Sequence, residues 1–155
     1  GATGATGATG AAGATGATGA AGGLPAGLYA INSSGLVSPT IAVGSPIPFN
    51  TPVTTFGAGI SQLDVDTFQV TGPGTFSVTF ILSTAALSLL GGAQVQVDGA
   101  PVGATFTLIS AGTPILGQAL FIVGAGAHTV EIVATGAAVT LATGNNASII
   151  IEQVA

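Results

Sequence analysis

Glycine occupies every third position at the start of the chain, from residue 1 to residue 22. Only glycine fits at the crowded axis of a collagen triple helix, so three chains that wind around one another require this period. The repeat predicts a collagen-like stalk over residues 1–22 and a separate head domain over residues 23–155. A flexible linker is the alternative interpretation, because the stretch has no proline to favour the extended conformation beforehand.

Threonine fills the third position of most of these triplets, and its side chain would point away from the axis of a triple helix. The residues concerned are Thr3, Thr6, Thr9, Thr15 and Thr18. A row of exposed hydroxyls could carry O-linked sugars, or it could simply hydrate a stalk that lacks proline. The residues alone leave both alternatives open.

The composition removes several classes of function. The chain has no Lys and no Arg, so no basic patch can neutralise phosphates, which argues against nucleic-acid binding. It has no Cys, so neither disulfides nor thiolate metal sites are available. Gly, Pro, Thr or Ser interrupts every apolar stretch before the ~18 residues that a membrane span needs. We therefore predict no cofactor and no membrane span, and a fold held together by burial.

From residue 24 onward the hydrophobic pattern has a period of two, which is typical of β-strands. Phe76, Val78 and Phe80 alternate with Ser77 and Thr79. Strands are expected at residues 28–31, 67–70, 76–82, 94–97, 106–109, 119–123, 129–134, 138–141 and 148–154. No helix is expected.

The segment 94–97 runs into Asp98-Gly99, a strong signal for a two-residue hairpin turn, and the chain returns through Val102. Many short strands with frequent turns predict an antiparallel β-sandwich of the jelly-roll type. An immunoglobulin-like sandwich is the alternative, although the chain lacks that fold's Cys–Trp–Cys pattern.

Two of the expected strands are apolar on both faces, so one face needs a cover beyond the domain's own core. The residues concerned are Leu120, Phe121, Ile122 and Val123 in one strand and Ile149, Ile150 and Ile151 in the other. We predict that they contribute to a subunit interface. A stalk of three chains implies a threefold head, so the predicted assembly is a homotrimer.

The sequence offers little for catalysis or metal binding. His128 is the only candidate general base, and no Cys, Lys or nucleophile motif accompanies it, so we predict no enzyme and no catalytic residue. Asp64 and Asp66 could present two carboxylates on one face, which a threefold axis would multiply into a cation site. The favoured alternative is that they cap a turn before Thr67, and we predict no metal.

Several segments that follow the repeat resemble a known family. They are LPAGLYA at 24–30, PFNT at 48–51, ISQLD at 60–64, DTF at 66–68 and ASIIIE at 147–152. With the Gly-X-Y repeat, they make the chain similar to the BclA-like collagen-like glycoproteins of the Bacillus spore exosporium. The similarity extends over residues 24–155.

The resemblance implies a trimeric jelly roll of the C1q and tumour-necrosis-factor kind, located outside the cell at the tip of the hair-like nap of the spore. It implies O-glycosylation of Thr3, Thr6, Thr9, Thr15 and Thr18, although the triplets here read Gly-Ala-Thr rather than the also common Gly-Pro-Thr. The expected function is structural. An adhesin that binds a host surface or a complement ligand is the alternative. Other exosporium proteins would be contacted through an amino-terminal segment that is not in this chain.

Overall fold

The computed structural model describes residues 1–19, 22–86, 88 and 90–155, and every regular element in them is a β-strand. The strands are β1 Ala26–Ser33, β2 Thr40–Ile41, β3 Thr51–Gly57, β4 Ile60–Gln62, β5 Phe68–Leu82, β6 Gly92–Val97, β7 Ala100–Thr107, β8 Ile115–Thr135, β9 Val139–Thr140 and β10 Asn145–Gln153. None of the described residues belongs to a helix that could cross a bilayer. All pairings between strands are antiparallel, which confirms the predicted all-β antiparallel class.

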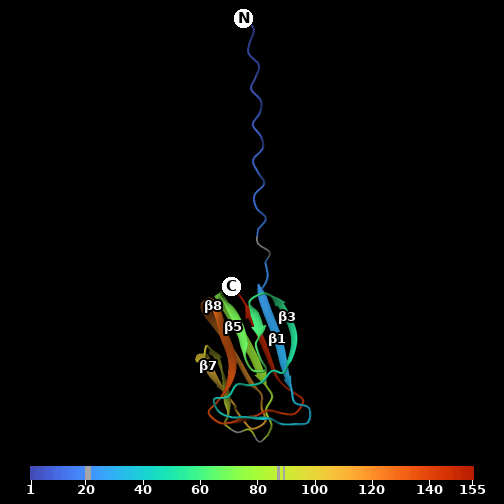
Figure 1. Cartoon of the computed structure of the whole chain (residues 1–155), viewed down its shortest axis with the longest axis vertical. Helices are drawn as coiled ribbons and strands as arrows, with labels where there is room; N and C mark the ends of the chain where they lie inside the picture. The colour runs from blue at the N-terminus through green and yellow to red at the C-terminus, as the bar shows by residue number, and fades with distance from the viewer. Residues whose placement is uncertain (20–21, 87, 89) are drawn as a thin grey trace.

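Residues 1–19 form an extended thread that leads away from the head (Figure 1). All of these residues are exposed, and a Cβ atom added to any glycine from Gly1 to Gly22 would meet nothing within 4 Å. The thread approaches the head at the end where β1 begins and where the carboxy terminus also lies. The opposite end of the head is made of loops.

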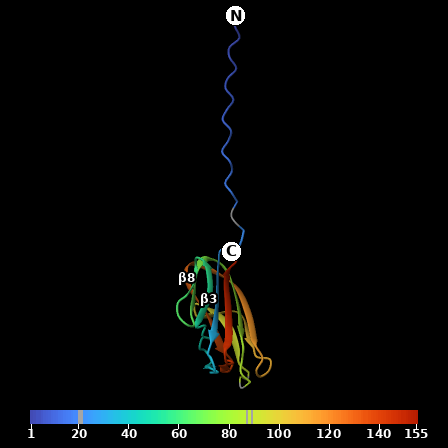
Figure 2. The same cartoon turned by 90° about the vertical axis from the view of Figure 1, so that its right-hand side faces the viewer.

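The head is a sandwich built around one continuous hydrogen-bonded path, β3-β1-β10-β5-β8-β6-β7, with β4 paired to β5. β10 pairs with residues 76–82 of β5, whereas β4 pairs with residues 68–70 of the same strand. β5 and β8 are thus shared between two layers. Figure 2 shows the head turned by 90°, with the strands running along its length.

The change of layer occurs at a glycine-rich bend in both shared strands. The register between β5 and β8 shifts between Gly72 and Gly74, opposite the segment from Val123 to Gly126. A Cβ atom at Gly72 would collide with the Gly124 carbonyl oxygen, so only glycine allows the two backbones to approach this closely. The two strands continue beyond the bend and build the second layer.

This continuity differs from the sequence-based prediction of short, separate strands. Segments 119–123 and 129–134, which we expected as two strands, belong to the 21-residue β8. Segments 67–70 and 76–82 fall almost entirely within the 15-residue β5. Gly124 and Gly126 bend the chain without ending its hydrogen bonding. The glycines that we interpreted as a turn between two strands are therefore a bend within one strand, where it passes from one layer to the other.

The core follows the alternation that the sequence shows. Phe76, Val78, Phe80 and Leu82 of β5 are fully buried, while the residues between them face outward. The Phe80 ring meets the Phe106 ring of β7 edge-on, with centroids 6.0 Å apart, which joins the two layers. The predicted hairpin at Asp98-Gly99 is confirmed, because both residues have positive φ and Val97 pairs with Ala100.

Candidate subunit interface

Alternation divides the seven predicted interface residues into two groups. Four of them point into the core of their own chain and are buried there: Phe121, Val123, Ile149 and Ile151. The other three point outward, with Leu120 69% exposed, Ile122 80% exposed and Ile150 42% exposed. The second group remains available to another subunit. A run of apolar residues in the sequence could not distinguish the two faces of a strand.

The register collects further outward apolar side chains on the same face of the first layer. Ile150 of β10 lies opposite Tyr29 of β1, and Ile81 of β5 lies opposite Leu116 of β8. All of these side chains are between one third and two thirds exposed. The face therefore presents apolar side chains from β1 to β8, with the uncharged Ser77, Thr79, Gln118 and Ser148 among them, and we call it the outer face of the sheet. No charged residue interrupts it except Glu152, opposite Gly27.

A hollow of about 280 Å³ lies at the β1–β3 side of the outer face. Its lining includes Tyr29, Phe56, Ile150 and Glu152. The Phe56 ring lies against Gly27, where a Cβ atom would collide with it, so glycine at this position leaves room for the ring. Leu120 and Ile122 project from β8, at the other side of the same layer.

β3 itself is exposed along all seven residues, on both faces. It ends the strand order, so one of its edges has no strand partner among the residues that the structure describes. Natural proteins usually protect such an edge with charges or cover it with another element. β3 carries no charge, and Pro52 is its one residue that opposes pairing at the edge. Val53 and Phe56, both half-exposed, add apolar surface that a neighbour could cover.

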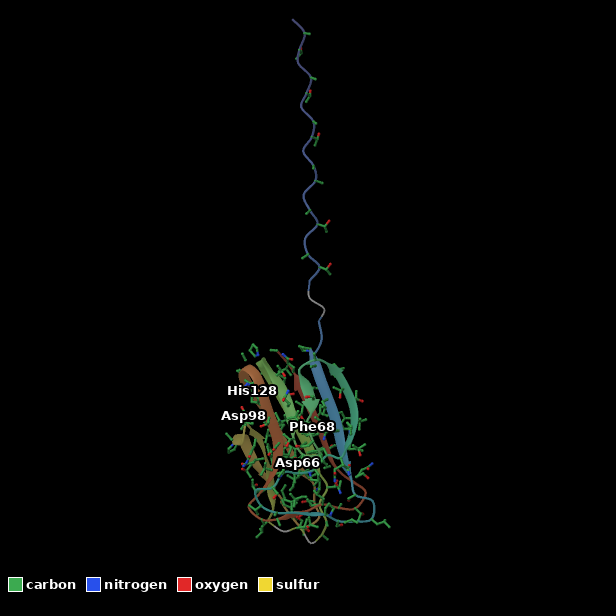
Figure 3. All side chains as sticks on the ribbon, viewed as in Figure 1. Asp66, Phe68, Asp98 and His128 are labelled. Carbon is green, nitrogen blue, oxygen red and sulfur yellow. The ribbon has the colours of Figure 1, made fainter. Side chains whose placement is uncertain are left out.

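The structure supports the turn-capping interpretation for Asp64, whereas the carboxylate of Asp66 accepts from the Thr67 hydroxyl and not from the backbone of the turn. One carboxylate oxygen of Asp64 accepts hydrogen bonds from the backbone N–H of Asp66 (3.1 Å) and of Thr67 (2.9 Å), so Asp64 caps the turn before β5. Hydrogen bonds from Asp66 lower the pKa of Asp64. Partial burial, together with the neighbouring carboxylate of Asp64, raises the pKa of Asp66. Figure 3 labels Asp66 beside Phe68, where β5 begins.

Thr67 connects this turn to a third acid, because its hydroxyl lies 3.1 Å from Asp66 and 3.0 Å from Glu131 of β8. No group of three or more acidic or His side chains with metal-binding geometry occurs among the residues that the structure describes. The absence of a metal site remains a prediction from the sequence.

His128 is engaged through both ring nitrogens, a relationship that the sequence did not reveal. Nδ1 contacts Asp98 in the turn between β6 and β7, and Nε2 contacts the Gly124 carbonyl oxygen at the bend of β8. Neither nitrogen is left for a general base in this conformation. Asp98 and His128 are thirty positions apart, and only the pairing of β6 with β8 brings them together.

Comparison with known families agrees with this geometry. The model of the BclA C-terminal domain matches residues 28–155, which is most of the chain. The chain belongs to the BclA C-terminal domain family. No curated protein sequence matches it.

Likeness to solved structures shows that this chain has the jelly-roll fold of the C1q and tumour-necrosis-factor type. Murine APRIL is 15% identical, covers 82% of this chain and 98% of its own, and gives a TM-score of 0.58. The globular domain of zebrafish complement 1qA is 14% identical, covers 81% and 93%, and gives a TM-score of 0.56. The vertex protein P5 of PRD1 is 17% identical, covers 86% and 100%, and gives a TM-score of 0.52. At these identities the likeness shows the fold.

Proposed function

We propose that this chain is a structural surface protein of the bacterial spore exosporium, whose head forms a homotrimer and nucleates a collagen-like triple helix in residues 1–22. The observation that carries the proposal is the uncovered apolar outer face. Burying Leu120 and Ile122 alone would contribute about 1.5–3 kcal/mol for each side chain. A stable chain that leaves so much of one face exposed is best explained by a partner that covers it.

A threefold ring needs two different surfaces that fit each other, because each subunit contacts its neighbours head to tail. The outer face offers such a pair. Leu120 and Ile122 project at the β8 side, and the hollow that Phe56 helps to line lies at the β3 side. In the proposed trimer, the projecting pair of one subunit packs against the β1–β3 side of the next.

The position of the amino-terminal thread supports the proposed stalk. β1 begins at Ala26, at one end of the head, and residues 1–19 extend outward from that end (Figure 1). Three parallel subunits would therefore release their three repeats side by side. Each repeat would be held in register by the head, which a short stalk without proline requires.

The resemblance to the family adds two expectations to the proposed role, one about glycosylation and one about location. The stalk would carry O-linked sugars on Thr3, Thr6, Thr9, Thr15 and Thr18, all of which are exposed here. The head would lie outside the cell, at the outer end of a spore-surface filament. The sequence fits an exposed location, since it contains no Cys, Met or Trp to oxidise and no Lys or Arg for trypsin-like proteases.

The mass of the full chain in solution tests the assembly. Light scattering at low micromolar concentration is expected to give three times the 14.5 kDa of one chain, and the value should persist on dilution. The double variant Leu120→Ser, Ile122→Ser should give the mass of a single chain while its far-ultraviolet circular dichroism remains that of a β protein. A wild-type chain that is monomeric would overturn the proposal.

The stalk is tested separately by replacing its glycines. The full chain should show the circular dichroism of a triple helix and lose that signal cooperatively on heating. Gly10→Ala together with Gly13→Ala should abolish the signal, because no side chain fits at the axis, while the trimeric mass remains. The control Ala11→Ser with Ala14→Ser changes the same region away from the axis and should retain the signal. A trimeric head without any triple-helix signal would leave residues 1–22 as a linker.

A further inference from the structure

Four segments of the head meet at the end that faces away from the amino-terminal thread, at the bottom of Figure 1. They are residues 34–44, 83–91, 108–114 and 136–144, of which 87 and 89 lie outside the described part. We call this surface the loop end. Backbone hydrogen bonds join the four segments: Ser34 N to Gly144 O, Leu141 N to Pro39 O, Ala85 N to Thr140 O and Leu108 N to Gly91 O. The β2–β9 pair and the hydrogen bond from Thr84 Oγ1 to Thr113 O connect them further.

The loop end carries no charge. None of the four segments contains Asp, Glu, His, Lys or Arg. All acidic and His side chains of the chain lie in other segments: Asp64, Asp66, Asp98, His128, Glu131 and Glu152. A charged partner would therefore find no complementary group here.

Large aliphatic side chains project from this surface into the solvent. Leu36 is 97% exposed, Ile109 is 93% exposed and Leu90 is 83% exposed, and Val37 and Val43 are also more than half exposed. They come from three of the four joined segments. Leu90 adopts a positive φ of 58°, a conformation that is unfavourable for a leucine. Folding does not require these side chains, because they pack against little of the head.

We propose that the loop end is an adhesive surface that adsorbs to bare apolar surfaces, meaning surfaces whose hydrocarbon faces water directly. Adsorption to such a surface removes the projecting aliphatic side chains from water and requires no charged group on the protein. This activity goes beyond the structural role proposed above, and a single copy of the head is sufficient for it. In a trimer the three loop ends would act together and strengthen adsorption.

The side chains present favour a bare surface over a lipid bilayer. A bilayer covers its hydrocarbon with a polar interface, where proteins anchor through Trp and Tyr and through Lys or Arg. The four segments contain none of these residues. Apart from uncharged Ser and Thr, the side chains that they expose are short aliphatic ones, which match an uncovered hydrocarbon boundary.

Partition of the full chain onto hexadecane droplets in water tests the proposal. The triple variant Leu36→Ser, Leu90→Asn, Ile109→Ser removes the three most exposed side chains, and asparagine tolerates the positive φ at position 90. Its partition constant is expected to fall by about a thousandfold if all three side chains are fully buried on adsorption, since each contributes about tenfold. Unchanged thermal unfolding would show that the variant is folded.

The matched control is Leu24→Ser, Leu63→Ser, Val65→Ser, which removes three half-exposed aliphatic side chains from elsewhere on the chain. This control should partition almost as the wild type does. Vesicles of uncharged phosphatidylcholine form the second arm, and little binding to them is expected.

Several outcomes would overturn the proposal. The proposal fails if the wild type and the loop-end variant have equal partition constants. It also fails if the partition constant falls equally in the loop-end variant and in the control variant. Vesicle binding as strong as droplet binding would identify a bilayer as the partner. A loop-end variant with a smaller mass in light scattering would show instead that this surface contacts a second copy. A monomeric wild type that still adsorbs through the loop end would refute the trimer and leave this inference standing.

Discussion

Nδ1 of His128 lies 2.7 Å from Oδ2 of Asp98, and Nε2 of the same ring lies 3.1 Å from the Gly124 carbonyl oxygen (Figure 3). Both partners are hydrogen-bond acceptors, so both contacts are satisfied as hydrogen bonds only when the ring is protonated and both nitrogens donate. With no Lys or Arg in the chain, the protonated ring is the only side-chain cation. The ring connects the β6–β7 turn to the bend of β8.

Because of this pair, we expect the stabilisation of the folded head to be lost both at high pH and in acid. The hydrogen bond to Asp98 raises the pKa of His128 above its ordinary 6.5, so the stabilisation is present below that value and is lost as the pH rises through the raised pKa. The same hydrogen bond lowers the pKa of Asp98 below its ordinary 3.8, so the stabilisation is lost again in acid. It should be greatest between about pH 4 and pH 6.5.

The thermal unfolding midpoints of the wild type and His128→Gln measure this effect across the pH range. Subtracting one from the other cancels the titration of the remaining carboxylates. The difference should be largest near pH 5 and should shrink at alkaline pH and in strong acid. Asp98→Asn should give the same profile. A difference that does not change with pH would show that the two side chains do not form an ion pair in solution.

The sequence predicted those parts of the fold that local rules determine. The alternation from Phe76 to Leu82 predicts a buried strand face, and Asp98-Gly99 predicts its turn, because each depends on neighbouring residues alone. β3 was missed because Thr51–Gly57 has no clear alternation and contains a proline. Its place in the sheet is decided by β1, whose paired residues lie twenty or more positions earlier in the sequence.

The candidate site was predicted only in part, for a related reason. An apolar run such as 120–123 signals burial on both faces of a strand, but it does not say which face the subunit's own core covers. The contribution of Tyr29, Phe56 and Ile81 to the outer face depends on the register of four strands. The ion pair of His128 depends on the register of β6 with β8, and no local pattern carries that information.

The buried amides of Asn32 and Asn146 predict a coupled contribution to stability. The Asn32 Nδ2 group donates to Oδ1 of Asn146 at 2.9 Å, and Asn146 donates in turn to Ser34 and to the Ala142 carbonyl oxygen. Asn146→Ala would leave buried polar groups without partners, which costs about 1–3 kcal/mol of unfolding free energy. Denaturant unfolding measures the loss.

The adjacent Asn145 provides the control for this prediction, because it is exposed. Asn145→Ala should change the unfolding free energy by less than about 0.5 kcal/mol. In a double-mutant cycle, Asn32→Ala and Asn146→Ala should be less than additive, by about 0.5–3 kcal/mol. Strict additivity would argue that the two amides act independently.

At two glycines of β8, the same substitution to alanine is expected to have very different effects on stability. A Cβ atom at Gly117 would collide with the Phe80 ring and would lie 2.7 Å from the Phe106 ring, so Gly117→Ala should destabilise the head by about 1–3 kcal/mol. A Cβ atom at Gly124 would meet nothing within 4 Å, and Gly124→Ala should stay within about 0.5 kcal/mol of the wild type. Thermal unfolding separates the two cases. Equal effects would mean that the rings at Gly117 move aside at no cost.

Leu120 and Phe121 are neighbours in β8 whose side chains point to opposite faces, so they separate folding from assembly. Phe121 is buried and its ring stacks on Phe76, with centroids 6.1 Å apart, so Phe121→Ala should cost about 3–5 kcal/mol of subunit stability. Leu120→Ala removes a side chain from the outer face and should leave the secondary structure unchanged while it weakens the trimer. The measurements are circular dichroism for folding and light scattering on dilution for assembly. If Leu120→Ala neither lowers the mass nor speeds dissociation, then the projecting edge of β8 is not part of the interface, and the contact between subunits must be sought on β3.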